Sequence, residues 1–135
     1  MGVEDYLVTS TITGVVAQRL VRKLCDACRE PYAALPELVA QLRLAEAGRE
    51  VVLHRPRGCD GCRGSGYRGR IAVLEFLAMS DAIRRLVLRH AEAGELHRAG
   101  AAQGMRSMYD DGLRKALLGV TSLEEVLRVT RDVGN

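Results

Sequence analysis

Four cysteines are the residues of this sequence best placed to do chemistry. They form two Cys-x2-Cys pairs separated by thirty residues: Cys25, Cys28, Cys59 and Cys62. Two residues between cysteines let a tight turn aim both sulfurs at one ion, and two such turns supply four thiolates at about 2.3 Å from a tetrahedral zinc. Protein ligands then fill every position and leave none for water or substrate. The spacing therefore predicts a structural Zn²⁺ site rather than a catalytic one.

Other uses of the same cysteines stay open at this point. Rubredoxin-type iron has the same paired spacing, although one Phe and four Tyr supply few of the aromatic side chains expected around such a centre. Disulfide formation after loss of metal is another alternative, and so is simple packing. A thioredoxin-like motif needs only one pair. Cysteine–histidine catalysis lacks an evident orienting partner for any of the three histidines, His54, His90 and His97.

Glycines follow the second pair in the order Cys-x2-Cys-x-Gly-x-Gly over residues 59–66. This pattern is similar to the zinc repeats of DnaJ-type chaperones. The similarity is local, because residues 25–32 around the first pair lack the glycines. Glycine adopts positive φ at no steric cost, so Gly64 and Gly66 are expected where the chain bends away from the metal.

The charge of the chain favours no particular class of partner. Its 20 Lys and Arg and 17 Asp and Glu give a formal net charge of +3. Residues 55–70 hold five Arg and one Asp, an excess that could contact phosphate. Four thiolates around Zn²⁺ are net negative, however, and nearby arginines are expected to balance them: Arg22, Arg29, Arg57 and Arg63. Tyr67 alone offers base stacking there, so nucleic-acid binding is disfavoured.

Length and composition are those of an ordinary folded domain. The chain has 135 residues, a mass of 14.8 kDa and 47% apolar residues, which excludes disordered and collagen-like classes. No stretch approaches the roughly 18 consecutive apolar residues of a membrane span. Residues 1–5 lack the basic-then-apolar order of a secretory signal. The sequence therefore predicts a soluble, cytoplasmic protein.

The N-terminal part is ambiguous between helix and strand. Apolar residues at helical spacing predict a helix over residues 12–24, with Thr11 or Thr13 as its N-cap. The last turn of this segment could equally run into a short strand over residues 19–24.

A short helix and two strands are expected around the second cysteine pair. The helix is predicted over residues 36–47, because Pro36 suits a first turn and Gly48 ends the segment. Residues 50–54 and 70–77 are predicted strands, the second of them following a run of turn-forming residues.

Beyond residue 78 the apolar pattern is helical throughout. Four helices are predicted, over residues 81–90, 95–103, 107–118 and 121–131. Ser80 caps the first, and Gly104 and Gly119 end the second and third. The run Thr121-Ser122-Leu123-Glu124 is a predicted capping box, in which the Thr121 hydroxyl bonds the amide three residues on and Glu124 reaches back.

Six segments carry patterns that agree with one known family in order and spacing. They are MGVEDYLV at 1–8, ITGVVAQRLVRKLC at 12–25, GYRGR at 66–70 running into the strand, GMR at 104–106, DGLRK at 111–115 and GVTSLEEV at 119–126. Together they resemble the C-terminal third of the type II secretion and type IV pilus assembly ATPases, the GspE/PilB family. The resemblance covers essentially the whole chain.

The resemblance implies an α+β fold in four parts. Residues 1–24 would be the tail of a RecA-like ATPase domain, with helix and strand. Residues 25–66 would form a tetracysteine zinc-binding lobe with a short helix, inserted between strands of the truncated motor domain. Residues 67–79 would be a strand that returns to the motor sheet beside residues 19–24. Residues 80–135 would be a C-terminal bundle of about four helices.

The resemblance also limits the expected function. No Gly-x4-Gly-Lys-Ser/Thr phosphate loop occurs in the sequence, so this chain is expected to be a non-catalytic fragment with an interaction role. ATP and Mg²⁺ would bind only to the full-length parent. The parent would be a cytoplasmic homohexamer that powers pseudopilus assembly and associates with the inner membrane through platform proteins. The alternative is a stand-alone zinc-dependent module that binds nucleic acid or protein.

Overall fold

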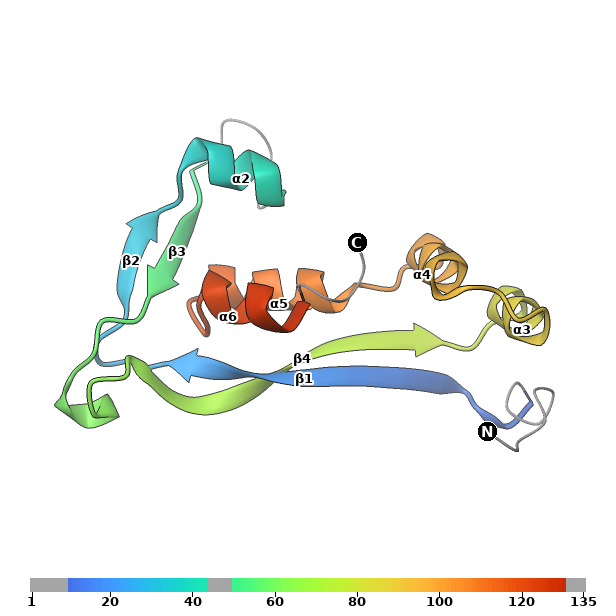
Figure 1. The fold of residues 1–135 in the computed structure, drawn as a ribbon, viewed down its shortest axis with the longest axis horizontal. Coiled ribbons are helices and arrows are strands. Elements are labelled where there is room, and N and C mark those ends of the chain that lie inside the picture. The colour runs from blue at the N-terminus through green and yellow to red at the C-terminus, as the bar shows by residue number, and fades with distance from the viewer. Residues whose placement is uncertain (1–9, 44–49, 131–135) are drawn as a thin grey trace.

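The computed structural model describes residues 10–43 and 50–130 (Figure 1). The strands are β1 (Gly14–Leu24), β2 (Glu30–Ala33), β3 (Val52–Arg55) and β4 (Tyr67–Ala78). The helices are α2 (Pro36–Leu42), the 3₁₀ helix η1 (Asp60–Cys62), α3 (Asp81–Leu88), α4 (Ala93–Ala102), α5 (Met108–Leu117) and α6 (Leu123–Thr130). The predicted mixture of helix and strand is confirmed. In the described residues, no helix combines the length and the apolar character needed to cross a membrane.

β1 and β4 form a long antiparallel ribbon that runs along one side of the molecule (Figure 1). The pairing extends from Gly14 opposite Ala78 to Leu24 opposite Tyr67. The predicted helix over residues 12–24 is therefore wrong, because residues 14–24 are strand throughout. Three valines in this segment favour extended backbone, and β4 supplies the partners for its backbone hydrogen bonds. The expected proximity of residues 19–24 to residues 70–77 is confirmed.

A small lobe rises from one end of the ribbon (Figure 1). In it, β2 and β3 pair antiparallel, from Glu30 opposite Arg55 to Ala33 opposite Val52. α2 follows β2 and begins at Pro36, as expected. It ends at Leu42, where Arg43 adopts a left-handed conformation with φ of 54°. Residues 44–47 of the predicted helix lie outside the described residues.

Hydroxyl side chains cap three of the C-terminal helices. Ser80 Oγ accepts from the Ile83 amide at 3.2 Å, as predicted, and Ser107 Oγ caps α5. The predicted capping box at residues 121–124 is wrong by one residue. Ser122 Oγ, not the Thr121 hydroxyl, accepts from an amide of the first turn of α6, that of Glu125 at 3.3 Å. The Thr121 hydroxyl donates instead to a backbone carbonyl of β1.

The four C-terminal helices form two pairs rather than a single bundle. α3 packs against α4 near one end of the ribbon, and α5 packs against α6 nearer the lobe (Figure 1). The bounds of α5 agree with the sequence prediction to within one residue, whereas α3 ends two residues early, α4 begins two residues early and α6 begins two residues late.

α5 and α6 lie between the ribbon and the lobe (Figure 1). On the ribbon side, Val21 and Val73 pack with Met108 and Val129. On the lobe side a second core joins α2 and β3 to the same helices: Val39, Val51, Leu53, Leu113, Ala116, Leu123 and Val126. One helix pair therefore fixes the lobe relative to the ribbon.

α5 and the turn that precedes α6 also cover the outer edges of the ribbon. On β1, the Thr121 hydroxyl donates to the Arg22 carbonyl at 2.7 Å. On β4, the Lys115 ammonium donates to the Ala72 carbonyl at 2.7 Å. Backbone groups satisfied in this way are not free to pair with another strand.

The close contact of α5 with α6 depends on Gly112. A Cβ at this position would lie 2.7 Å from Val126 Cγ1. We expect Gly112→Ala to lower the free energy of unfolding by about 1–3 kcal/mol, because overpacking outweighs the gain of about 1 kcal/mol in helix propensity. Thermal and urea denaturation would measure this. The matched control is Gly94→Ala in α4, where a Cβ meets only the flexible Arg98 side chain at 3.4 Å. Equal stability of the two variants would contradict the packing argument.

Candidate metal centre

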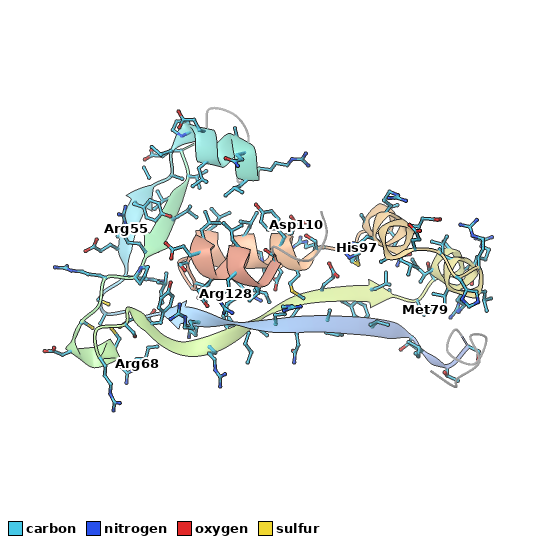
Figure 2. The ribbon with its side chains drawn as sticks, in the orientation of Figure 1. Arg55, Arg68, Met79, His97, Asp110 and Arg128 are labelled. Atoms are coloured by element: carbon cyan, nitrogen blue, oxygen red, sulfur yellow. The ribbon has the colours of Figure 1, made fainter. Side chains whose placement is uncertain are left out.

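The four cysteines meet where the ribbon joins the lobe, and their sulfur atoms gather at this corner in Figure 2. Cys25 follows β1 and Cys28 precedes β2, so the first pair lies where the chain leaves the ribbon. Cys59 caps η1 and Cys62 ends it, so the second pair lies where the chain returns. The cluster thus joins the two crossings between ribbon and lobe.

The sulfur atoms form a compact group. All four Sγ atoms lie within 4.8 Å of one another. Cys25 and Cys28 each have a Sγ partner from the second pair at 3.8 Å, and the Sγ atoms of Cys59 and Cys62 are 3.7 Å apart. Thiolates at about 2.3 Å around a tetrahedral zinc stand about 3.8 Å apart. The four cysteines are free, and their spacing fits the ligand set of one tetrahedral ion.

Backbone amides point at two of the sulfurs. The Cys59 and Gly66 amides donate to Cys62 Sγ at 3.2 and 3.1 Å, and the Gly58 amide donates to Cys28 Sγ at 3.3 Å. Burial raises the pKa of the Cys62 thiol, but the amides of Cys59 and Gly66 and the neighbouring thiols outweigh the effect of burial and lower that pKa to about 6. At Cys28 burial dominates, and the pKa is raised to about 11. Cys62 therefore takes the thiolate form, which metals bind, most readily of the two.

Gly66 connects the two halves of the cluster. Its carbonyl accepts from the Cys25 amide at 2.9 Å, while its own amide donates to Cys62 Sγ. Its φ is +81°, and a Cβ would lie 2.3 Å from Pro56 Cβ, so no other residue fits here. The positive φ expected at Gly64 and Gly66 is confirmed.

Comparison with known proteins shows the family of this chain. The profile of the family described as "Type II/IV secretion system protein" matches residues 1–128. The chain is 53% identical to type II secretion system protein E of Xanthomonas campestris over 134 residues, 98% of this chain and 24% of that protein. It is 44% identical to type II secretion system ATPase E of Vibrio cholerae, over 98% of this chain and 26% of that protein. The chain belongs to the type II/IV secretion system family.

A pilus protein is among the relatives too. The type IV pilus assembly ATPase PilB of Thermus thermophilus is 40% identical over 96% of this chain and 15% of its own length. The resemblance to secretion and pilus assembly ATPases is thereby confirmed. The chain spans about a quarter of the length of the type II secretion relatives it matches.

Three of the arginines expected to balance the cluster have carboxylate partners in this family member. The pairs are Arg22 with Glu125 at 2.9 Å, Arg57 with Glu30 at 3.2 Å and Arg29 with Asp26 at 4.0 Å. Arg29 also donates to the Gly119 carbonyl. Arg63 directly follows Cys62 and is exposed. Much of the positive charge near the cluster is thus neutralised locally.

The histidines lie outside the sulfur cluster. Among the described residues, the group that could hold a metal consists of the four cysteines. His97 lies in α4, and its Nε2 is 3.5 Å from Oε2 of Glu75 in β4 (Figure 2). His54 has a buried Nδ1 with no hydrogen-bond partner among the described residues, and burial lowers its pKa with Arg29 adding to the shift. Neither histidine offers a base to a cysteine nucleophile.

Glu125 is a structural residue that the sequence does not identify. Its side chain is 2% exposed, although it is charged. Both carboxylate oxygens are used: Oε1 accepts from the Arg22 guanidinium at 2.9 Å, and Oε2 accepts from Arg128 at 2.9 Å. Figure 2 shows Arg128 between α6 and the ribbon. The guanidinium of Arg22 also stacks over the Tyr67 ring at 4.1 Å. This network ties α6 to the ribbon end that carries the cysteines.

Proposed function

We propose that Cys25, Cys28, Cys59 and Cys62 bind one structural Zn²⁺ in the C-terminal region of a secretion ATPase. The observation that carries this proposal is the spacing of about 3.8 Å between sulfurs of two turns, which matches tetrahedral thiolate coordination. The four cysteines would fill the coordination shell of a bound Zn²⁺, which would then supply no chemistry beyond cross-linking. The four cysteines would hold together the two turns that connect the ribbon to the lobe.

The role of this region would be interaction and not hydrolysis. Its sequence has no Gly-x4-Gly-Lys-Ser/Thr loop to cradle nucleotide phosphates. ATP and Mg²⁺ would therefore bind elsewhere in the full-length protein. Its relatives include proteins named as secretion and pilus assembly ATPases, which supports ATP-driven transport as the activity of the whole.

For the division of the chain we propose the four parts that the family resemblance implies. Residues 1–24 and 67–79 would belong to a RecA-like motor sheet, residues 25–66 to the inserted zinc lobe and residues 80–135 to the helical subdomain. The long antiparallel ribbon on either side of the lobe supports an insertion. So does the apolar face that the ribbon exposes, which suits packing against another layer of a larger domain: Val16, Leu20, Leu74 and Phe76.

The full-length protein would act as a homohexamer in the cytoplasm, held at the inner membrane by platform proteins of the secretion system. The lobe would contact a neighbouring subunit or the platform. Its attachment to α5 and α6 supports this role, since helices packed on the lobe on one side and on the ribbon on the other can transmit force between the two. Nucleic-acid binding is not favoured, because the Arg22 guanidinium lies over the ring of Tyr67 and, within the basic segment, Arg57 pairs with Glu30.

Metal content tests the zinc proposal directly. Elemental analysis of protein purified without added metal should give one zinc per chain, and four thiols should titrate in denaturant after chelation. A chain with four free thiols and no metal would reduce the cysteines to packing residues. A chain with disulfides and no metal would point to a redox or covalent role.

A chimera tests the role in secretion. The matching quarter of the Xanthomonas campestris protein would be replaced by this chain, and export would be measured in a strain lacking its own copy. We expect the chimera to support export, and Cys62→Ser in the chimera to abolish it. Export that survives loss of the cysteine would contradict the proposed structural role of the metal.

A further inference from the structure

The four cysteine residues are not equally protected from solvent. Cys25, Cys28 and Cys62 are 2%, 8% and 7% exposed, whereas Cys59 is only partly buried. Both residues that follow Cys59, Asp60 and Gly61, are exposed. Cys59 is therefore the least buried residue of the cluster.

Gly61 leaves this approach open. A Cβ at Gly61 would lie 3.6 Å from Cys59 Sγ, and no other atom outside its immediate neighbours lies within 4 Å of that position. The φ of Gly61 is outside the positive range, unlike those of Gly58, Gly64 and Gly66. Neither backbone conformation nor packing thus requires glycine at this position, and its effect is to leave one side of the sulfur uncovered.

A second thiol stands next to the exposed one. Cys62 Sγ lies 3.7 Å from Cys59 Sγ within the same turn. An accessible cysteine beside a second cysteine that can close a disulfide is the arrangement found at oxidation-sensitive sites. We propose that Cys59 is the modification site of this cluster, at which peroxides and soft electrophiles react first. The consequence for the metal rests on the proposed zinc site.

The reaction with peroxide balances in two steps. The Cys59 thiolate attacks one oxygen of hydrogen peroxide, the O–O bond breaks, and the hydroxide released takes a proton to become water, which leaves a sulfenic acid on Cys59. The Cys62 thiolate then attacks the Cys59 sulfur, the S–O bond breaks, and hydroxide leaves and is protonated to a second water. Two sulfurs lose two electrons to the peroxide. The disulfide removes two of the four ligands, and the lobe loses its cross-link.

The test follows the order of cysteine modification in the intact chain. Metal content is measured first, and then limiting N-ethylmaleimide is added and the labelled cysteines are mapped by mass spectrometry. Cys59 should be labelled about tenfold faster than the other three. Gly61→Ala should slow this labelling several-fold by covering the sulfur, and Gly61→Val should slow it further. The matched control, Asp60→Ala, changes the exposed neighbour and should leave the rate unchanged.

Oxidation by hydrogen peroxide is the second test of the proposal. It should produce a Cys59–Cys62 disulfide and release one zinc per chain, measured with a colorimetric chelator. Equal labelling of the four cysteines, labelling that starts elsewhere, or a rate insensitive to residue 61 would overturn the assignment of Cys59. A chain without metal would defeat the zinc proposal alone, since the labelling order still decides the assignment.

Discussion

Cys62→Ser is expected to release the metal and to lower the free energy of unfolding by more than about 5 kcal/mol, because metal binding and folding are coupled in thiolate zinc sites. Cys62 is buried, and its sulfur accepts two backbone amides in addition to contacting two other cysteines. In the serine variant, those two amides would donate to a neutral hydroxyl instead of a thiolate. Elemental analysis and thermal denaturation followed by circular dichroism would measure both effects.

The structure extends the region that this substitution should disrupt. The sequence alone suggests that loss of a ligand, as in Cys59→Ser, unfolds the lobe and leaves the late helices partly formed. The core shared by Leu53, Leu113 and Val126 implies that α5 and α6 loosen with the lobe. Hydrogen exchange should therefore rise in α5 and α6 and change little in the α3–α4 pair. Retained zinc together with an unchanged melting curve would refute the role of Cys62, and Asp60→Ala is the control within the same turn.

Glu125→Gln is expected to lower the free energy of unfolding at neutral pH by about 2–3 kcal/mol. The carboxylate is 2% exposed and binds the guanidinium groups of Arg22 and Arg128, as well as the Arg22 amide at 2.8 Å. A neutral amide keeps the shape but offers one acceptor oxygen and no charge. Urea denaturation would measure the loss. Glu124→Gln, on the exposed side of the same helical turn, is the matched control and should change stability by less than about 0.5 kcal/mol.

The pH dependence of the stability difference between wild type and Glu125→Gln gives a sharper test. Burial raises the pKa of Glu125, but hydrogen bonds from Arg128 and Arg22 outweigh it and lower that pKa to about 2. Because the folded-state pKa is below the unfolded value of about 4.3, the stabilisation is complete above that value and is lost as pH falls toward 2. The gap between wild type and Glu125→Gln should therefore be constant above about pH 5 and narrow below it. A gap independent of pH down to about 3 would mean that the carboxylate charge does not stabilise the fold.

The sequence alone predicts the sulfur cluster and the late helices of this protein. The two Cys-x2-Cys pairs predict one sulfur cluster, and the structure brings those four residues together. Local signals also determine the late helices, because Ser80 and the glycines at positions 104 and 119 act within a single turn of backbone. Such features depend on residues three or four apart, and so they can be predicted without knowledge of the tertiary fold.

Tertiary structure alone decides the remaining features. Residues 14–24 have apolar residues at a spacing that fits a helix, yet pairing with β4 makes them a strand, and that partner lies about fifty residues away. Thr121 leaves its predicted capping role to Ser122 because its hydroxyl bonds β1. Glu125 is buried only because two arginines from separate elements converge on it. The sequence thus determined the four cysteines of the cluster and the local turns, whereas long-range hydrogen bonds and burial decided the ribbon, the position of α6 and which cysteine is least buried.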